Sequence, residues 1–363
     1  MKWVSGLKGS LKIILRQVLI IVVSLLLASV FLGLTGYDPF AILAGMWRGM
    51  TVDLAGTIRW ATPLILAGLA ICITFKAQVW NLGVDGQINV GAAAATAVAL
   101  YLHQGNQFIS VVIVFLAAMA AGMILAIIPA LLKVFFDTNE VVSTLLLNFI
   151  SVLFISYLVV GPMRDPNEVA ILNASEKIPA WTWLPRIKFF NPSPANWGFY
   201  IALAAVLVIA FIFYKTKLGY EIKIVGANPD LAFYSGMKPK QITISVMAIS
   251  GALAGIIGAI EVTAVQHKLI TGFNPSFGFD GIVASLLANN NPLGVVLSAL
   301  FFGNLKNAGI TMERLTDVPS AMTNIVQAII ILTITANYAI PKLNKIRKNF
   351  LLRKISSDAT TRK

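Results

Sequence analysis

KTKLGYEIKIVGANPDLAFYSGMKPKQ, residues Lys215–Gln241, separates two strongly apolar regions of the chain. The stretch carries five basic residues against two acidic ones, Glu221 and Asp230. Its middle predicts a short helix, because Asn228 is a good N-cap and Pro229 suits the first helical position. Asp230 then places a negative charge on the N-terminal end of the helix dipole.

The C-terminal end of this predicted helix also has clear sequence signals. Gly236 can take the left-handed conformation that ends a helix, and Pro239 prevents continuation. A helix of about two turns is too short to be stable in water by itself. Because it presents Leu231, Phe233 and Tyr234, we expect it to dock into a groove of another protein. The alternative is an ordinary loop helix that folds back on its own bundle.

The composition predicts an integral membrane protein. Hydrophobic residues make up 58% of the 363 residues and charged residues 12%, and the mean hydropathy is +0.82. We therefore expect an all-α polytopic protein, a single transmembrane domain over residues 1–363 with about ten spans of about 20 residues each. Cys72 is the only cysteine, so a disulfide within the chain is excluded.

The net charge of +13 is concentrated in three places. Four basic residues lie in 1–16, five in 215–240 and eight in 342–363. This is the positive-inside pattern of cytoplasmic segments, so it calls for no nucleic-acid partner. We expect a cytoplasmic N-terminus (1–10), a cytoplasmic loop (215–241) and a basic cytoplasmic tail (342–363) that meets anionic lipid. The 35-residue segment 162–196, with six prolines, is then an external loop.

The apolar runs predict the spans and where they break. We expect spans at about 11–34, 60–75, 108–136, 141–161, 197–214, 242–265 and 320–340. Asn81 begins a polar interruption before the third span, and Asn289–Pro292 splits a later run into two short apolar pieces, which suits broken or tilted helices. Residues 36–59, in which Asp38, Arg48, Asp53 and Arg59 balance one another, suit an external interfacial segment.

Two short motifs resemble each other. Gly83–Gly86 and Gly278–Gly281 share a glycine–apolar–aspartate–glycine pattern 195 residues apart. By the count of spans, the helices that follow them run in opposite directions. This predicts an inverted repeat of five plus five spans with broken helices around a transport path.

Asp85 and Asp280 are the strongest candidates for that path, because an ionisable group inside a membrane costs several kcal/mol and usually serves a pathway or a partner. The alternative is that each aspartate caps the helix that follows it. Amides that would also face a polar solute are Asn81, Gln87, Asn89, Asn148, Asn289 and Asn290. Their alternative role is to satisfy backbone groups at helix breaks or to join helices.

Metal and enzyme chemistry are poorly supported. His103 and His267 stand alone without the spacing of metal ligands, and Glu261 is expected at the outer end of its span. The sequence holds no P-loop pattern, no HExxH motif and no credible nucleophile–histidine pair. We therefore expect no cofactor and no catalytic residue, and a transporter driven by ATP would need a separate ATPase.

Four stretches together resemble the permease subunits of bacterial nucleoside ABC importers, within a wider group of simple-sugar and branched-chain amino-acid permeases. They are NLGVDGQINVGA from Asn81, NEVVSTLLLNFIS from Asn139, YEIKIVGANPDLAFYSGM from Tyr220 and GFDGIVASLLANNNPLGVVLSALFFG from Gly278. The resemblance covers roughly residues 60–340.

The resemblance implies a channel-forming subunit in the bacterial cytoplasmic membrane that carries nucleosides inward. It implies an ABC ATPase subunit, a second similar permease and an external substrate-binding lipoprotein as partners. The segment Gly226–Gly236 is similar to the coupling helix of this family, so the residues expected to contact the ATPase are Gly226, Asn228, Pro229, Asp230, Leu231, Phe233, Tyr234 and Gly236.

Three alternatives remain open from the sequence. The cargo of an ABC permease could be a ribose-like sugar or a branched-chain amino acid. An ion-coupled secondary transporter can have the same inverted repeat, although intramembrane carboxylates other than Asp85, Asp280 and Glu261 are few. A membrane scaffold without a solute path has no use for polar breaks within several spans.

Overall fold

A computed structural model of the protein describes residues 38–101, 105–166, 173–190 and 194–315, with single positions within 26–33 and 319–329. The predicted N-terminus and basic tail therefore lie outside the described residues, as do most of the predicted first and last spans and parts of the predicted external loop. The chain forms two compact units, residues 53–307 and a second unit of Met1–Val52 with Ala308–Lys363.

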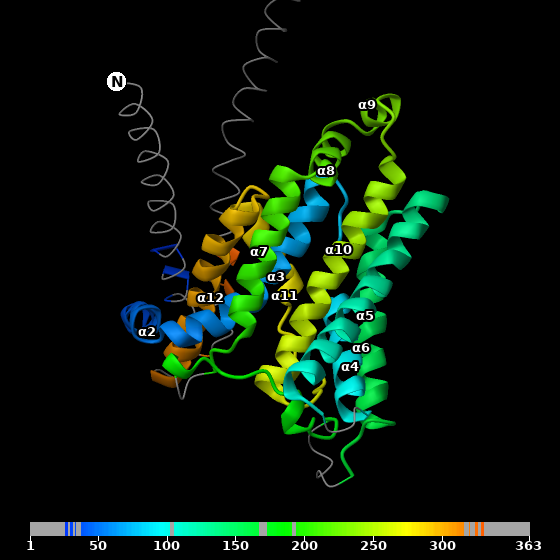
Figure 1. The fold of residues 1–363 in the computed structure, drawn as a ribbon. Coiled ribbons are helices and arrows are strands. Elements are labelled where there is room, and N and C mark those ends of the chain that lie inside the picture. The colour runs from blue at the N-terminus through cyan, green and yellow to red at the C-terminus, as the bar shows by residue number, and fades with distance from the viewer. Residues whose placement is uncertain are drawn as a thin grey trace, which may run out of the picture. The chain divides into compact units, whose positions relative to one another are not determined.

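The described part of the chain is mostly helical (Figure 1). Its α-helices are α2 (Pro39–Val52), α3 (Leu54–Lys76), α4 (Val84–Tyr101), α5 (Gln107–Phe136), α6 (Glu140–Val160), α7 (Gly198–Lys215), α8 (Lys217–Ala227), α9 (Pro229–Tyr234), α10 (Pro239–Ile260), α11 (Phe277–Leu287) and α12 (Pro292–Leu315). Single turns η1 (Ala180–Thr182) and η2 (Lys188–Phe190) lie before α7, and the π-helical turn η3 (Glu261–Gln266) extends α10.

Six of the described helices are long and apolar enough to cross a membrane: α3, α5, α6, α7, α10 with η3, and α12. α11 is a shorter apolar helix. The chain is thus a multi-pass helical membrane protein, as predicted. The predicted break after α11 is confirmed, because Asn289 and Asn290 have left-handed φ values of 53° and 51° and end the helix before Pro292 begins α12.

α3 and α10 form the core of the unit 53–307. All the residues of α3 from Ala61 to Phe75 are buried. α10 packs closely on α5, because a β-carbon at Gly255 would lie 2.1 Å from the Ala118 carbonyl oxygen and one at Gly251 2.3 Å from that of Gly122. Small residues therefore let α10 approach its neighbour closely.

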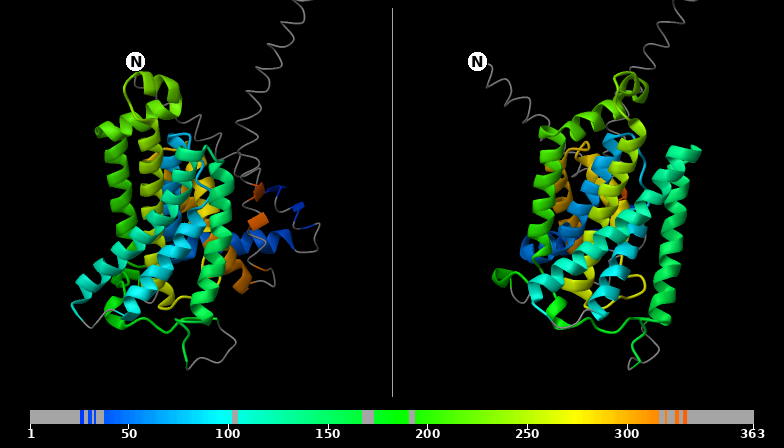
Figure 2. Two further views of the ribbon diagram at one scale, coloured as in Figure 1. Left: turned by 90° about the vertical axis from the view of Figure 1, so that its right-hand side faces the viewer. Right: turned by 45° about the vertical axis from the view of Figure 1, so that its right-hand side comes forward.

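The two ends of the unit 53–307 carry different elements (Figures 1 and 2). α8, α9 and the turn between α5 and α6 lie at one end, and residues 173–190 lie at the other.

Within the second unit, α2 packs on the end of α12 at Gly49. A β-carbon added to Gly49 would lie 2.6 Å from the Ala308 α-carbon.

One prediction about charges is wrong. Arg59 does not balance acidic neighbours in an interfacial segment, because it lies inside α3 with 9% of its surface exposed. Its guanidinium donates two hydrogen bonds, of 3.1 and 2.7 Å, to the carboxylate of Glu261 in η3, which is 1% exposed. A buried charge without a partner of opposite sign is strongly destabilising, so the two side chains stay paired and join α3 to the end of α10.

Candidate functional site

The two glycine–aspartate motifs meet in space. The Asp85 carboxylate in the first turn of α4 accepts a 2.7 Å hydrogen bond from the backbone N–H of Gly278 in the first turn of α11. It also accepts a 3.0 Å bond from the Asn274 amide, whose oxygen accepts the N–H of Phe277 at 3.0 Å. Asp85 therefore caps the other motif's helix rather than its own, which the sequence alone did not predict.

Asp280 has a different partner. Its carboxylate pairs with the Lys306 ammonium on α12, and both side chains are largely buried. The same ammonium lies 5.6 Å from the Trp60 ring centre and 5.3 Å from that of Phe277. This ammonium therefore lies among one carboxylate and two aromatic faces, which favour a cation. Lys306 could have been found from the sequence, because a charge inside an apolar helix signals function or pairing.

The predicted amides around α4 form a buried network. Asn81 and Gln87 exchange hydrogen bonds of 3.1 and 3.0 Å, and Asn81 also donates to Ser250 of α10 at 2.9 Å. Asn81 is 0% and Gln87 1% exposed. These contacts fix the extended chain before α4 against α10, and the Gly83 N–H donates to Asn81 as well.

The amides of α4 and α6 face each other across the same break. Asn148 on α6 accepts from the Gly86 N–H at 2.7 Å and donates to the Leu82 carbonyl at 2.8 Å. Asn89 donates to Ser151 at 3.2 Å. The contacts are those of side chains that satisfy a broken backbone and join helices, the alternative considered from the sequence.

Asn289 and Asn290 lie apart from this cluster. They follow the C-terminal end of α11, whose 11 residues span about 16 Å, whereas Asp85 is bound at its N-terminal end. Asn290 accepts a 2.9 Å bond from the Ser285 hydroxyl. The structure thus divides the predicted pathway residues into one group at the start of α4 and α11 and a second group at the end of α11.

The short helix of the charged stretch is α9, and its predicted geometry is confirmed. The Asn228 side chain accepts from the Leu231 N–H at 3.0 Å, Pro229 occupies the first turn, and Gly236 has a φ of 80°. Leu231, Phe233 and Tyr234 are 57, 66 and 86% exposed.

The opposite face of α9 carries Ala232, which is fully buried. The helix α8, which the sequence did not reveal, precedes α9 and shares Asn228 with it. Gly226 serves the approach of α8 to the end of α3, since an added β-carbon there would lie 2.0 Å from the Lys76 carbonyl oxygen.

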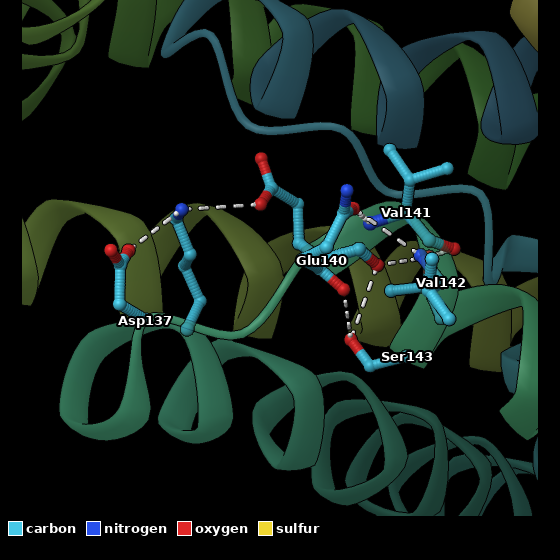
Figure 3. A network of polar contacts seen from close by, with 8 residues as sticks. Asp137, Glu140, Val141, Val142 and Ser143 are labelled. Carbon is cyan, nitrogen blue, oxygen red and sulfur yellow. Dashed lines mark hydrogen bonds and ion pairs between the residues drawn. The ribbon is translucent and has the colours of Figure 1, made fainter.

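The turn between α5 and α6 lies at the same end as α9 and carries a network of charges (Figure 3). The Lys133 ammonium lies 3.0 Å from Asp137 and 3.6 Å from Glu140. Asn139 caps α6 by accepting from the Val141 N–H at 2.9 Å.

The pKa of His267, at the other end of the unit, lies below its ordinary value. Burial of the ring lowers this pKa, and the charges of Lys177 and Arg186 lower it further.

No group of three or more His, Cys, Asp or Glu side chains with metal-binding geometry occurs among the residues that the structure describes. The site is therefore built from amides, two aspartates and a lysine, placed where two helices begin. Such groups can bind a polar solute weakly by hydrogen bonds and can hold broken helices in place.

Three relatives cover most of the chain. A guanosine ABC transporter permease protein of Bacillus subtilis, NupP, is 32% identical over 90% of this chain and 94% of its own length. A nucleoside ABC transporter permease protein of Lactococcus lactis, NupB, is 28% identical over 96% of this chain and 97% of its own. A glucose ABC transporter permease protein of Haloferax volcanii, TsgB13, is 35% identical over 75% of this chain and 73% of its own.

Residues 54–335 match a protein family described as the permease component of the branched-chain amino acid transport system. That range contains every candidate residue described above and all six candidate spans. The chain is therefore a member of this family of transport permeases, a membrane-spanning transport component and not an enzyme.

Proposed function

We propose that this chain is the membrane subunit of an ABC importer that moves nucleosides, purine nucleosides above all, into the cell. Two relatives with nucleoside or guanosine transport in their names span nearly its whole length, which supports this cargo. All three reported relatives are ABC permeases. This favours transport that is powered by a separate ATPase over transport that is powered by an ion gradient.

The observation that carries the proposal is the exposure of α9. A helix of six residues cannot hold itself together in water, yet it is capped at its start and anchored by a buried Ala232. It presents Leu231, Phe233 and Tyr234 outward. We propose that this face, with Gly226, Asn228, Pro229, Asp230 and Gly236 shaping it, seats in a groove of the ATPase and receives its movement.

The solute path is proposed to pass the start of α4 and α11. Asp85 holds the beginning of α11, and Asp280 in the first turn of α11 pairs with Lys306 of α12. Asn81, Gln87 and Asn148 hold the chain that leads into α4, and Asn89 joins α4 to α6. Asn289 and Asn290 would then contact solute farther along the path, at the end of α11. Weak hydrogen bonds at two levels suit a solute that must be released.

The proposed architecture is ten spans in an inverted repeat of five plus five. The contact between the starts of α4 and α11, each preceded by a non-helical segment, supports it. The loop 215–241, the N-terminus 1–10 and the tail 342–363 would lie on the cytoplasmic side of a bacterial membrane. The loop 162–196 would then lie outside, because the basic residues are concentrated in the first three segments.

A second permease and an external substrate-binding lipoprotein are the further proposed partners. α6 keeps large apolar side chains such as Leu146, Phe149 and Leu153 exposed. A face of this kind suits lipid or another membrane protein, so a heterodimer with a similar permease would cover part of it.

The test is ATP-dependent uptake of labelled guanosine by the chain reconstituted with its ATPase and binding protein. We expect unlabelled nucleosides to compete, and ribose, glucose, leucine and free guanine to leave uptake unchanged. The second candidate is a sugar permease, which the 35% identity to the glucose permease protein favours. ATP-dependent glucose uptake with inert nucleosides would establish the sugar permease instead.

A further inference from the structure

A groove lies between the beginnings of α5 and α7, at the end of the unit that carries residues 173–190. Its volume is about 620 Å³, and Phe108, Val112, Leu116 and Ile201 form much of its wall. Leu184 lines it as well. Because α5 and α7 are both candidate spans, this apolar groove would open toward lipid hydrocarbon.

A second cavity of about 260 Å³ adjoins the groove and has a different lining. The two share Gln107, Leu184 and Pro185, and the smaller one adds Arg186 and His267. Gln107 donates a 3.0 Å hydrogen bond to the Trp183 carbonyl, which fixes the wall between them. An apolar groove therefore continues into a chamber with a cationic side chain.

Two further observations point to a ligand with a polar head. The Nδ1 atom of His267 is buried and has no hydrogen-bond partner among the residues that the structure describes. Its ring stacks on Trp183 at 3.9 Å, and the Lys177 ammonium lies over the same indole at 4.9 Å. Arg186 and a buried polar nitrogen of His267 thus line one chamber with the Trp183 ring, and Lys177 lies over the same indole.

We propose that this site binds an anionic phospholipid, with an acyl chain in the α5–α7 groove and the phosphate beside Arg186. The volume lies within the ~300–1,000 Å³ of small-molecule sites, too narrow for a helix about 10 Å across. Trp197 at the rim is 52% exposed, and tryptophans of this kind sit at headgroup level. The guanidinium of Arg186 can pair with a phosphate group.

The test is photo-crosslinking in lipid nanodiscs made of phosphatidylethanolamine and phosphatidylglycerol. The probe is phosphatidylglycerol with a diazirine in its acyl chain, and mass spectrometry locates the labelled peptides. We expect labelling of residues 107–116 and 197–201 above that of the exposed α6 face. Arg186→Gln should reduce it about fivefold, the ratio that ~1 kcal/mol per basic residue corresponds to.

Matched variants separate the site from general lipid contact. Val112→Trp fills the groove and should abolish its labelling, whereas Leu153→Trp on the exposed face of α6 should not. Arg164→Gln, an exposed arginine elsewhere in the external segment, should leave labelling unchanged. Two outcomes would overturn the proposal. They are equal labelling of α5 and α6 that Val112→Trp does not change, and a groove labelled only by a protein crosslinker that joins it to a partner chain.

Discussion

Asp85 holds the start of another helix: its carboxylate accepts the Gly278 N–H at 2.7 Å, so the two glycine–aspartate motifs, 193 residues apart at these positions, are one structural unit. The contact is a hydrogen bond to an N–H that has no partner within its own helix, because it lies at a helix start. It brings the chain before α4 and the chain before α11 to one place.

Replacing Asp85 by Ala is expected to destabilise the folded protein by about 1–3 kcal/mol, because the Gly278 N–H and the Asn274 amide lose their acceptor. Asp85→Asn, which keeps one oxygen acceptor, should lose less. Thermal unfolding in detergent measures both. Asn139→Ala, which removes an exposed cap of α6, is the control and should cost about 1 kcal/mol. Equal stability of Asp85→Ala and wild type would contradict this role.

Breaking the Arg59–Glu261 pair is expected to cost about 3–5 kcal/mol, since either partner alone would be a buried charge without compensation. Glu261→Leu and Arg59→Leu test this singly. The double variant Arg59→Leu with Glu261→Leu should be more stable than the sum of the single losses implies. The pair Lys217–Glu221, 3.5 Å apart with an exposed lysine, is the control, where Lys217→Ala should change stability by about 0.5 kcal/mol or less. If the stability loss of the double variant equalled the sum of the two single losses, Arg59 and Glu261 would not be energetically coupled.

Leu231→Asp and Phe233→Asp are expected to weaken binding of the ATPase and to reduce uptake without unfolding the chain, because both side chains are exposed on α9. Truncation of a central apolar anchor in an interface commonly costs about 2 kcal/mol or more, roughly thirtyfold in affinity. Co-purification of the ATPase and nucleoside uptake measure the effect. The matched change Ala232→Asp, on the buried face, should instead lower the melting temperature. Full association of the Leu231 and Phe233 variants would rule out the docking role.

Gly255→Ala is expected to destabilise the α5–α10 contact by about 1–3 kcal/mol, because the new methyl would lie 2.1 Å from the Ala118 carbonyl oxygen and neither backbone can yield easily. Gly294→Ala is the control, since its methyl would meet the Ala288 side chain at 3.2 Å. Melting temperatures in one detergent compare the two. A Gly255→Ala protein as stable as the control would show that the helices can separate at little cost.

Stability is expected to fall as the pH drops below the ordinary His267 pKa of 6.5, because burial and nearby cations lower that pKa in the folded protein. The unfolded chain then binds the proton first, so protonation favours unfolding, and stability rises with pH through this range. Melting temperatures between about pH 5.5 and 7.5 should show a weaker pH dependence for His267→Gln than for wild type. A slope in His267→Gln equal to that of the wild type would contradict this role of His267.

Much of the helical layout could be predicted from the sequence. The ends of α5, α6, α7 and α10 follow apolar length, and α9 follows its cap and its terminating glycine, both local signals. Arg59 could not be assigned in the same way. Its neighbours in sequence include Asp53, and the charge that it binds lies 202 residues away on another helix.

In the candidate site, too, the sequence predicted local features but not the contacts between distant helices. The sequence indicated which polar residues interrupt the spans, but it left open whether Asp85 caps its own helix. It missed Asn274, because its partner Asp85 lies 189 residues away in α4. It also missed Lys306, although a charge inside an apolar helix was a signal for it.

The sequence by itself determined a multi-pass helical membrane protein, the breaks before α4 and after α11, and the exposed short helix α9. Apolar length, proline, glycine and capping residues act within a few positions of one another, so they can be read along the chain. Only the tertiary structure decided that Asp85 holds Gly278, that Arg59 binds Glu261 and that Asn81 and Gln87 are buried against α10. A charge or an amide out of water takes whichever partner the packing of distant helices brings within hydrogen-bond distance.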